Sequence, residues 1–181
     1  ITPMDLEIHL VPAARLTAHQ RTAVHRLCSL AFDRDYQPFL DIFWRSPSFH
    51  LLGWQGDELV THALWVERRL EMDGHVLSSA YVEGVCTHPA HERQGHGTAL
   101  MQRLAAEIQD YGIGGLATHS FGFYERLGWR RWPGDGFVRQ GDGALAPCPH
   151  DCLMILPTPL TPVVGEQSPV AIEWRPVIGV W

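Results

Sequence analysis

Two neighbouring segments decide the fold of this chain: Val82-Glu83-Gly84-Val85-Cys86-Thr87-His88-Pro89, and then Arg93-Gln94-Gly95-His96-Gly97-Thr98-Ala99-Leu100. The first is typical of a strand that stops at a proline, and the second of a glycine-bearing loop that opens a helix. Glycines let the backbone approach a ligand closely, and the first turn of a helix presents N–H groups with a partial positive charge. We therefore predict that the amides of Arg93 to Thr98 bind an anion such as a phosphate.

The rest of the chain predicts antiparallel strands followed by a strand–loop–helix–strand unit, which is a mixed α/β architecture. Strands are expected at 7–11, 49–54, 59–68, 76–86, 116–118, 129–132, 152–156 and 170–175. Helices are expected after a Thr17/Gln20 capping box, from about Thr98 to Asp110, and at 121–127. The segment from Asp33 to Asp41 mixes acids with aromatic residues and gives no clear pattern.

No repeat and no domain boundary is visible, so residues 1–181 are expected to form one domain. A proline-rich connector at 157–169 precedes the last expected strand. Residues 1–3 stand ahead of Met4, which we expect to be the native start.

Composition narrows the classes of function. The 181 residues are 45% hydrophobic and 19% charged, which is typical of a folded protein, and the formal net charge is -6. That balance excludes a generic nucleic-acid binder. It is compatible with a cationic ligand, and equally with a charge that only serves solubility. No apolar run approaches the roughly 18 residues of a membrane span, and no export signal is visible, so the expected location is the cytoplasm.

The four cysteines do not predict a metal site. Cys28 falls on the apolar stripe of a helix and Cys86 within a strand, as expected of reduced core thiols. Cys148 and Cys152 flank His150, but their spacing is not that of a zinc pair and no second ligand pair follows. We expect no metal.

The two opening segments resemble the acetyl-CoA site of the GNAT N-acetyltransferases, in which the strand runs beside the pantetheine arm and the loop amides bind the pyrophosphate. Phe123-Tyr124-Glu125-Arg126-Leu127-Gly128-Trp129 resembles the F-Y-x-x-x-G-[FW] motif of the same family. The resemblance implies a GNAT fold: one mixed, mostly antiparallel sheet flanked by helices, with a splayed strand pair holding acetyl-CoA. The cofactor-binding residues would be Val85, Cys86, Thr87, Arg93, Gln94, Gly95, His96, Gly97 and Thr98.

A narrower resemblance, to the aminoglycoside 2'-N-acetyltransferases, extends from about residue 5 to the end with gaps. It rests on Tyr81 to Val85, on the Tyr124 segment and on Glu173-Trp174-Arg175…Val180-Trp181. It implies a cationic aminoglycoside as substrate and antibiotic resistance as the outcome. The substrate-binding residues would be Asp35, Asp41, Glu83, Thr118 and Trp181 with its terminal carboxylate. Trp44 and Trp174 could offer a platform for a sugar ring, although core packing is the default for tryptophan.

Acetyl transfer to an amine needs a base for the proton of the cationic amine and an acid for the leaving thiolate. The family positions imply Glu83 as base and Tyr124 as acid. The N–H of Val85 is the expected donor to the thioester carbonyl. Transfer is expected to be direct, and the alternative is an acetyl-Cys86 intermediate. Strand alternation places Cys86 on the face opposite Glu83, which favours direct transfer.

Three departures from the family pattern bear on specificity. Glu92 stands where the family has Arg or Gln, so we expect its side chain to point away from the pyrophosphate. Gly179 replaces an acid two residues before the terminal Trp, and the stretch between Leu116 and Tyr124 is short and lacks the family's serine run. The last two changes favour a substrate with fewer amines, such as kasugamycin.

Two other functions stay open. A GNAT enzyme for another small amine or a protein N-terminus would not need the acid-rich segment or the Trp181 terminus. A non-catalytic acyl-CoA-binding module would keep the loop but tolerate loss of Glu83 and Tyr124. Members of the resembled family often form homodimers, and no heptad or exposed apolar stripe in this sequence bears on that.

Overall fold

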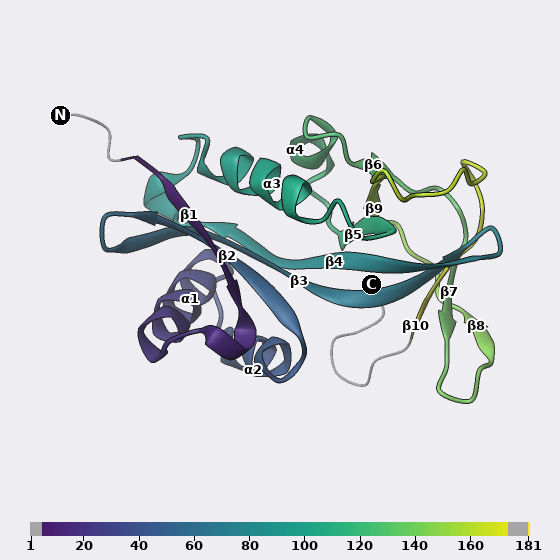
Figure 1. The fold of residues 1–181 in the computed structure, drawn as a ribbon, viewed down its shortest axis with the longest axis horizontal. Coiled ribbons are helices and arrows are strands. Elements are labelled where there is room, and N and C mark those ends of the chain that lie inside the picture. Colours follow the sequence, from purple (N-terminus) through teal and green to yellow (C-terminus); the bar gives the residue numbers. More distant parts are fainter. Residues whose placement is uncertain (1–4, 174–180) are drawn as a thin grey trace. The chain divides into compact units, whose positions relative to one another are not determined.

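Strands β3 (Glu58–Met72) and β4 (His75–Thr87) carry the region around the opening motif, and each contributes residues to both compact units of the chain. The structure is a computed structural model that describes residues 5–173 and 181. Residues 1–4, with the expected start at Met4, and 174–180, with Trp174 and Gly179, lie outside the described residues. Unit 1 comprises Ile1–Val66 and Val82–Leu104, and unit 2 comprises Glu67–Tyr81 and Ala105–Trp181. Figure 1 labels the elements of both units.

In unit 1, β1 (Glu7–Pro12) pairs antiparallel with β2 (Ser48–Gln55), and β2 pairs antiparallel with β3. The 3-10 turn η1 (Ala13–Arg15) leads to α1 (Ala18–Ala31), which begins with the predicted capping box: Gln20 N donates to Thr17 Oγ1 (3.2 Å) and Thr17 N to Gln20 Oε1 (3.0 Å). Figure 1 shows α1 and α2 on one side of the strands of this unit. Buried residues from these elements form one core: Ala13, Leu16, Val24, Leu27, Cys28, Tyr36, Leu40, Leu52, Leu59 and Cys86.

The segment without a sequence pattern contains a helix, α2 (Gln37–Arg45). Pro38 lies in its first turn, where the missing N–H costs nothing. Leu40 and Phe43 are fully buried, so packing on the core holds α2 in place. Asp41 therefore stands on a fixed element, and Asp35 lies two residues before its start.

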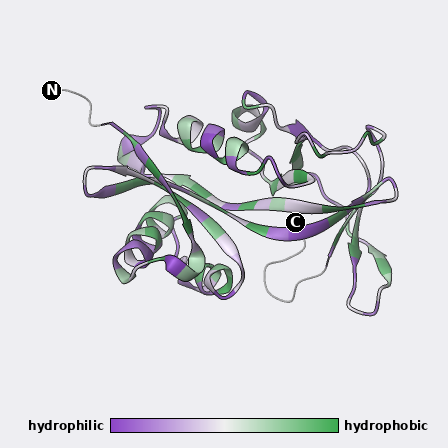
Figure 2. Ribbon diagram, in the orientation of Figure 1, coloured by the Kyte–Doolittle hydropathy of each residue, from purple (hydrophilic) through white to green (hydrophobic). Residues whose placement is uncertain are grey.

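The loop of the second opening segment joins the 3-10 turn η2 (Pro89–His91) to α3 (His96–Glu107). This helix begins two residues before the predicted start, and Leu100 and Leu104 of its predicted apolar face are fully buried. Figure 2 shows hydrophilic and hydrophobic residues alternating around α3, as expected of an amphipathic helix. Within residues 5–173, no helix is long and apolar enough to cross a membrane.

In unit 2, β5 (Ile113–Ala117) pairs parallel with β4 and antiparallel with β9 (Leu153–Leu156), which also pairs with β6 (Arg130–Arg131). The last described strand, β10 (Val170–Glu173), pairs antiparallel with β3 and parallel with β7 (Gly136–Arg139), and β7 pairs with β8 (Leu145–Pro147). The hairpin of β7 and β8 was not predicted. The helix α4 (Phe121–Glu125) stops before Gly128, whose φ is +90°. The described pairings confirm a mixed, mostly antiparallel sheet flanked by helices.

Candidate functional site

Strand β4 continues through Gly84 but is kinked there, because the φ of this residue is +59°. This is a left-handed conformation that glycine adopts without strain. On either side, Glu83, Val85 and Thr87 are half-buried, whereas Cys86 is only 8% exposed. This burial agrees with the predicted alternation. A left-handed glycine inside a strand is typical of a bulge, which re-aims the side chains beside it.

A buried polar cluster lies behind this kink. His62 Nδ1 is 2.8 Å from the carbonyl oxygen of Gly84 and 3.6 Å from Cys28 Sγ. The other ring nitrogen of His62, Nε2, is 2.9 Å from His50 Nδ1. His50 and His62 are fully buried, and Cys28 Sγ lies 3.8 Å from Cys86 Sγ.

The two thiols of this cluster influence each other. A hydrogen bond from Cys28 lowers the pKa of Cys86, and the same bond together with burial raises the pKa of Cys28 well above its ordinary value. The Cys86 thiol therefore contacts the buried face of α1 rather than the half-exposed face that carries Glu83. This placement gives no support to an acetyl-Cys86 intermediate.

Ligand atoms of Cys28, His62 and Cys86 all lie within 4.8 Å of one another, and two thiols with an imidazole are a donor set that suits zinc. The hydrogen bonds favour a different description. A carbonyl oxygen can only accept, so the 2.8 Å contact with Gly84 requires a proton on His62 Nδ1. That nitrogen then has no lone pair for a metal, and the cluster is best described as a hydrogen-bonded part of the core.

The loop before α3 has the geometry of an anion site. Arg93 and Gly95 have φ values of +60° and +86°, and Gln94 Nε2 donates to the carbonyl of Ala90 at 3.4 Å. Ala99 N bonds to Gly95 O, so the amides of His96 to Thr98 precede the hydrogen-bond ladder of the helix. Such amides, at the positive end of the helix dipole, attract a phosphate. Glu92 is exposed.

Three histidines accompany this loop, a feature that the sequence analysis missed. His88 Nε2 and His91 Nε2 lie 3.8 and 3.3 Å from the carboxylate of Glu58. His88 also accepts a hydrogen bond from Ala90 N on its Nδ1, so its proton resides on Nε2. The ring of His96 is buried and packs 6.2 Å from that of His91, and burial lowers the pKa of His96. The loop therefore offers the backbone of His96, not its ring.

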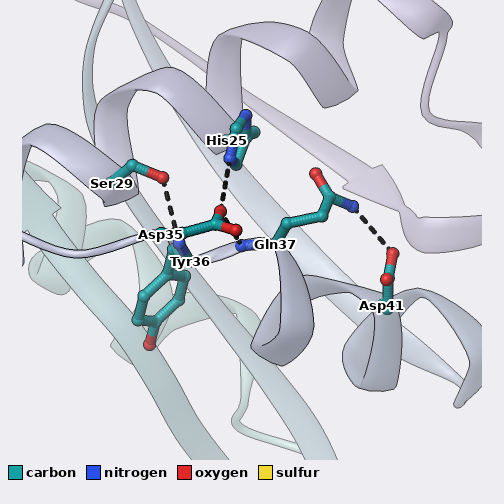
Figure 3. Close-up of polar contacts among 6 residues, drawn as sticks. All are labelled: His25, Ser29, Asp35, Tyr36, Gln37 and Asp41. Carbon is teal, nitrogen blue, oxygen red and sulfur yellow. Dashed lines mark hydrogen bonds and ion pairs between the residues drawn. The ribbon is translucent and has the colours of Figure 1, made fainter.

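The acids Asp35 and Asp41 are linked through Gln37, as Figure 3 shows. Asp35 Oδ1 accepts hydrogen bonds from His25 Nε2 (2.9 Å) and from the backbone N–H of Gln37 (3.0 Å), while Gln37 Nε2 donates to Asp41 Oδ1 at 2.7 Å. The bond from the Gln37 amide, followed by that from His25, lowers the pKa of Asp35. Asp35 is exposed and Asp41 is half-buried, so this acid segment presents charge at the surface of unit 1.

Tyr36 lies between the acids, with its ring turned away from them in Figure 3. The ring stacks between those of Phe32 and Phe39, at 4.7 and 5.0 Å. Burial, followed by the neighbouring Cys28 and Glu83, raises the pKa of Tyr36. The sequence analysis did not single out Tyr36, although an aromatic residue between two acids was a visible signal.

The remaining predicted residues belong to unit 2. Tyr124 is buried in α4, with its ring at right angles to those of Phe123 and Trp129. Thr118 is half-buried and its hydroxyl accepts a hydrogen bond from Ser120 N at 3.0 Å. The structure describes Tyr124 and Thr118 within unit 2 and does not place either residue beside Glu83 of unit 1.

Of the tryptophans proposed as substrate contacts, Trp44 and Trp181 lie within the described residues, and both are held by the protein. Trp181 Nε1 donates to Cys148 O at 2.9 Å, and its ring lies 5.0 Å from that of His150. The Arg21 guanidinium lies 4.7 Å over the ring of Trp44, so that face is not open to a sugar.

Comparison with known proteins agrees with the family resemblance of the sequence motifs. A family model described as an acetyltransferase (GNAT) domain matches residues 13–132. The aminoglycoside 2'-N-acetyltransferase of Mycolicibacterium fortuitum is 28% identical over 174 residues, which is 92% of this chain and 88% of that protein.

Solved structures share the fold at low sequence identity. A GNAT family acetyltransferase from Brucella melitensis, solved in complex with acetyl-CoA, has a TM-score of 0.63 and 13% identity over 94% of this chain and 97% of that one. A probable N-acyltransferase from Enterococcus faecalis has a TM-score of 0.60 and 15% identity over 70% of this chain. This chain matches only 33% of the length of the Enterococcus protein.

Proposed function

The chain belongs to the GNAT acetyltransferase family, and from this premise we propose that it acetylates the 2'-amino group of an aminoglycoside with acetyl-CoA as the donor. The observation that carries the proposal is the likeness to an aminoglycoside 2'-N-acetyltransferase, which extends over most of the chain. The acid segment supports it independently. Asp35 and Asp41 are oriented by hydrogen bonds at the surface, and carboxylates held in this way suit the amines of a polycation.

The loop residues fit acetyl-CoA. An added Cβ at Gly95 would meet nothing within 4 Å, so the backbone there is open to a close approach. The amides from Arg93 to Thr98 would hold the pyrophosphate. The edge of β4 at Val85, Cys86 and Thr87 would run beside the pantetheine arm. There the Cys86 carbonyl is occupied by the hydroxyl of Thr61, which donates to it at 3.0 Å and thereby steadies this edge.

Bound acetyl-CoA supplies an acetyl group activated as a thioester. Glu83 accepts the proton that the cationic amine must lose, directly or through a water, which frees the lone pair for attack. The Val85 N–H donates to the carbonyl oxygen as negative charge develops on it. Tyr124 gives its hydroxyl proton to the departing sulfur, and the second proton lost by the nitrogen balances that transfer. Asp35, Asp41, Thr118 and Trp181 would hold the sugar rings.

Within the aminoglycosides we propose kasugamycin, which carries few amines. The proposal rests on the short stretch between Leu116 and Tyr124 and on the glycine at position 179. Fewer carboxylates near the sugar leave fewer partners for a drug with many amines.

We also propose that the two units belong to one catalytic domain. The chain passes between them inside β3, β4 and α3, without a linker at any of these points.

The test is thiol release from acetyl-CoA with kasugamycin, gentamicin, tobramycin and a simple polyamine as acceptors. We expect turnover of kasugamycin and a loss of about 10²-fold or more in kcat/KM for Glu83→Gln, the range of general-base catalysis. Cys86→Ala, the matched control for a covalent route, should keep kcat within about threefold, since removing a group that does not react leaves the barrier unchanged.

Each proposal has its own contrary result. Turnover of gentamicin and tobramycin without kasugamycin would overturn the narrower substrate. Turnover of the polyamine alone would overturn the aminoglycoside class. Full activity of Glu83→Gln would overturn the assignment of the base.

A further inference from the structure

We infer that His62 is a positioning residue: its Nδ1–H bond to the Gly84 carbonyl holds the kink in β4 that aims Glu83. The inference rests on the proposed function, in which Glu83 is the base. It adds a residue that contacts neither substrate nor acetyl-CoA and acts only through the backbone beside Glu83.

The protons of the cluster can be assigned from the acceptors. Because the Gly84 carbonyl can only accept, His62 carries its proton on Nδ1 and, in its neutral form, leaves Nε2 as an acceptor. His50 Nδ1, 2.9 Å away, must then donate to it. His50 is neutral because burial lowers its pKa well below the ordinary value. The result is a chain of donors from His50 through His62 to Gly84.

The ring and the kink also fit sterically. A Cβ at Gly84 would lie 3.4 Å from His62 Cε1 and 3.6 Å from Nδ1, so the ring packs directly against the left-handed residue. His62 itself is fully buried, and hydrogen bonds in such surroundings are stronger than in water. The ring therefore supports the one backbone position that lies directly between Glu83 and Val85.

Two substitutions separate the two ends of this chain of donors. The amide nitrogen of His62→Asn lies as many bonds from Cα as Nδ1 does, so it can still donate to Gly84 but loses contact with His50. The amide of His62→Gln corresponds to Nε2, so it can contact His50 but cannot support Gly84. Both variants replace a buried ring by a smaller amide, which makes them a matched pair for stability.

We expect His62→Gln to lower kcat by about 30- to 100-fold, approaching the loss of the base, and His62→Asn by less than about fivefold. Acetyl-CoA affinity and melting temperature should change equally in both. In a double-mutant cycle, His62→Gln added to Glu83→Gln should cost less than about twofold more, since His62 acts through Glu83. Equal kcat in the Asn and Gln variants, or additive losses in the cycle, would overturn the inference.

A second measurement is independent of turnover. Nitrogen NMR of the histidine rings in the wild-type protein should find a neutral His62 with its proton on Nδ1. A proton on Nε2 alone would overturn the inference even if no acceptor amine were found. If a simple amine is acetylated in place of an aminoglycoside, the same cycle runs with that amine, so a wrong substrate and a wrong role for His62 give different results.

Discussion

Two groups of carboxylates in this chain are held in different ways. In unit 2, Glu71 forms a bidentate ion pair with Arg139, whose Nε and Nη2 donate to the two carboxylate oxygens at 2.7 and 2.6 Å. In unit 1, Asp41 is held by the neutral amide of Gln37, and Asp35 by a backbone N–H and by His25.

The difference determines how much negative charge each carboxylate can still offer to a ligand. A bidentate pair of opposite charges cancels itself and leaves both partners occupied. The neutral amides of Gln37 fix the direction of both carboxylates without cancelling their charge. The acid segment is therefore arranged to meet a cation, whereas Glu71 serves the structure of the sheet.

The strongest test removes the charge of the acid segment. We expect Asp35→Asn with Asp41→Asn to raise KM for the aminoglycoside about 10²-fold, because both charge-assisted hydrogen bonds to the amines of the substrate are lost. Acetyl-CoA KM should not change. Steady-state kinetics measures both. Glu71→Gln is the matched control and should stay within about twofold of wild type, and equal effects in the two variants would remove the distinction drawn above.

Salt should act on the acid segment next most strongly. Raising the ionic strength from about 0.1 M to about 1 M shortens the screening length from about 10 Å to about 3 Å. We expect KM for the aminoglycoside to rise about tenfold in the wild type and less than about threefold in the double variant, because only exposed, uncancelled charge is screened. A salt response that survives in the double variant would locate the attraction elsewhere.

The partner of Asp35 gives a smaller effect. His25→Ala removes the 2.9 Å contact but leaves the bond from the Gln37 amide. We expect KM for the aminoglycoside to rise about three- to fivefold, because the carboxylate loses one of the two hydrogen bonds that orient it. His9→Ala, which removes another histidine beside an acid of unit 1, should leave KM unchanged.

The smallest effect concerns stability and pH. Because the pKa of Asp35 is lowered in the folded protein, this carboxyl stabilises the fold above the pKa of about 3.9 that it has when unfolded. That contribution is lost as the pH falls through the folded value. Asp35→Asn should therefore melt slightly below wild type at pH 7, and the gap should shrink below about pH 4. A gap that widens in acid would contradict the sign of this pKa shift.

Sequence reasoning succeeded where the cause of an element is local. The capping box at Thr17 and the periodic leucines of α3 are short-range features: α1 begins directly after Thr17 as predicted, and α3 begins two residues and ends three residues before the predicted bounds. Helix α2 has neither, since its stability comes from Leu40 and Phe43 in a core built from distant strands. No window of sequence around Asp35 contains that information.

The candidate site likewise contains parts whose cause is local in the sequence and parts that depend on distant residues. The glycine loop and the kink at Gly84 carry their own signals, because a glycine at positive φ is a local requirement. The donor that supports the Gly84 carbonyl is His62, which lies 22 residues away in the sequence. His50 and His62 belong to two different predicted strands, and nothing in either strand shows that the two rings are in contact. The one signal that could have suggested this contact was the presence of a histidine, His50 or His62, at a core position of each of these strands.

The division of the chain has a consequence for its synthesis. Neither unit is a continuous stretch, so the first segment of unit 2 leaves the ribosome before unit 1 has received α3. Strand β10 pairs with β3, and the Arg68 side chain of β3 donates to the carbonyl of Glu173, 105 residues later. Contacts over such separations slow folding. The edge of β3 that pairs with β10 must therefore wait until residue 173 has been made, and the nascent protein completes this part of its sheet in a late step.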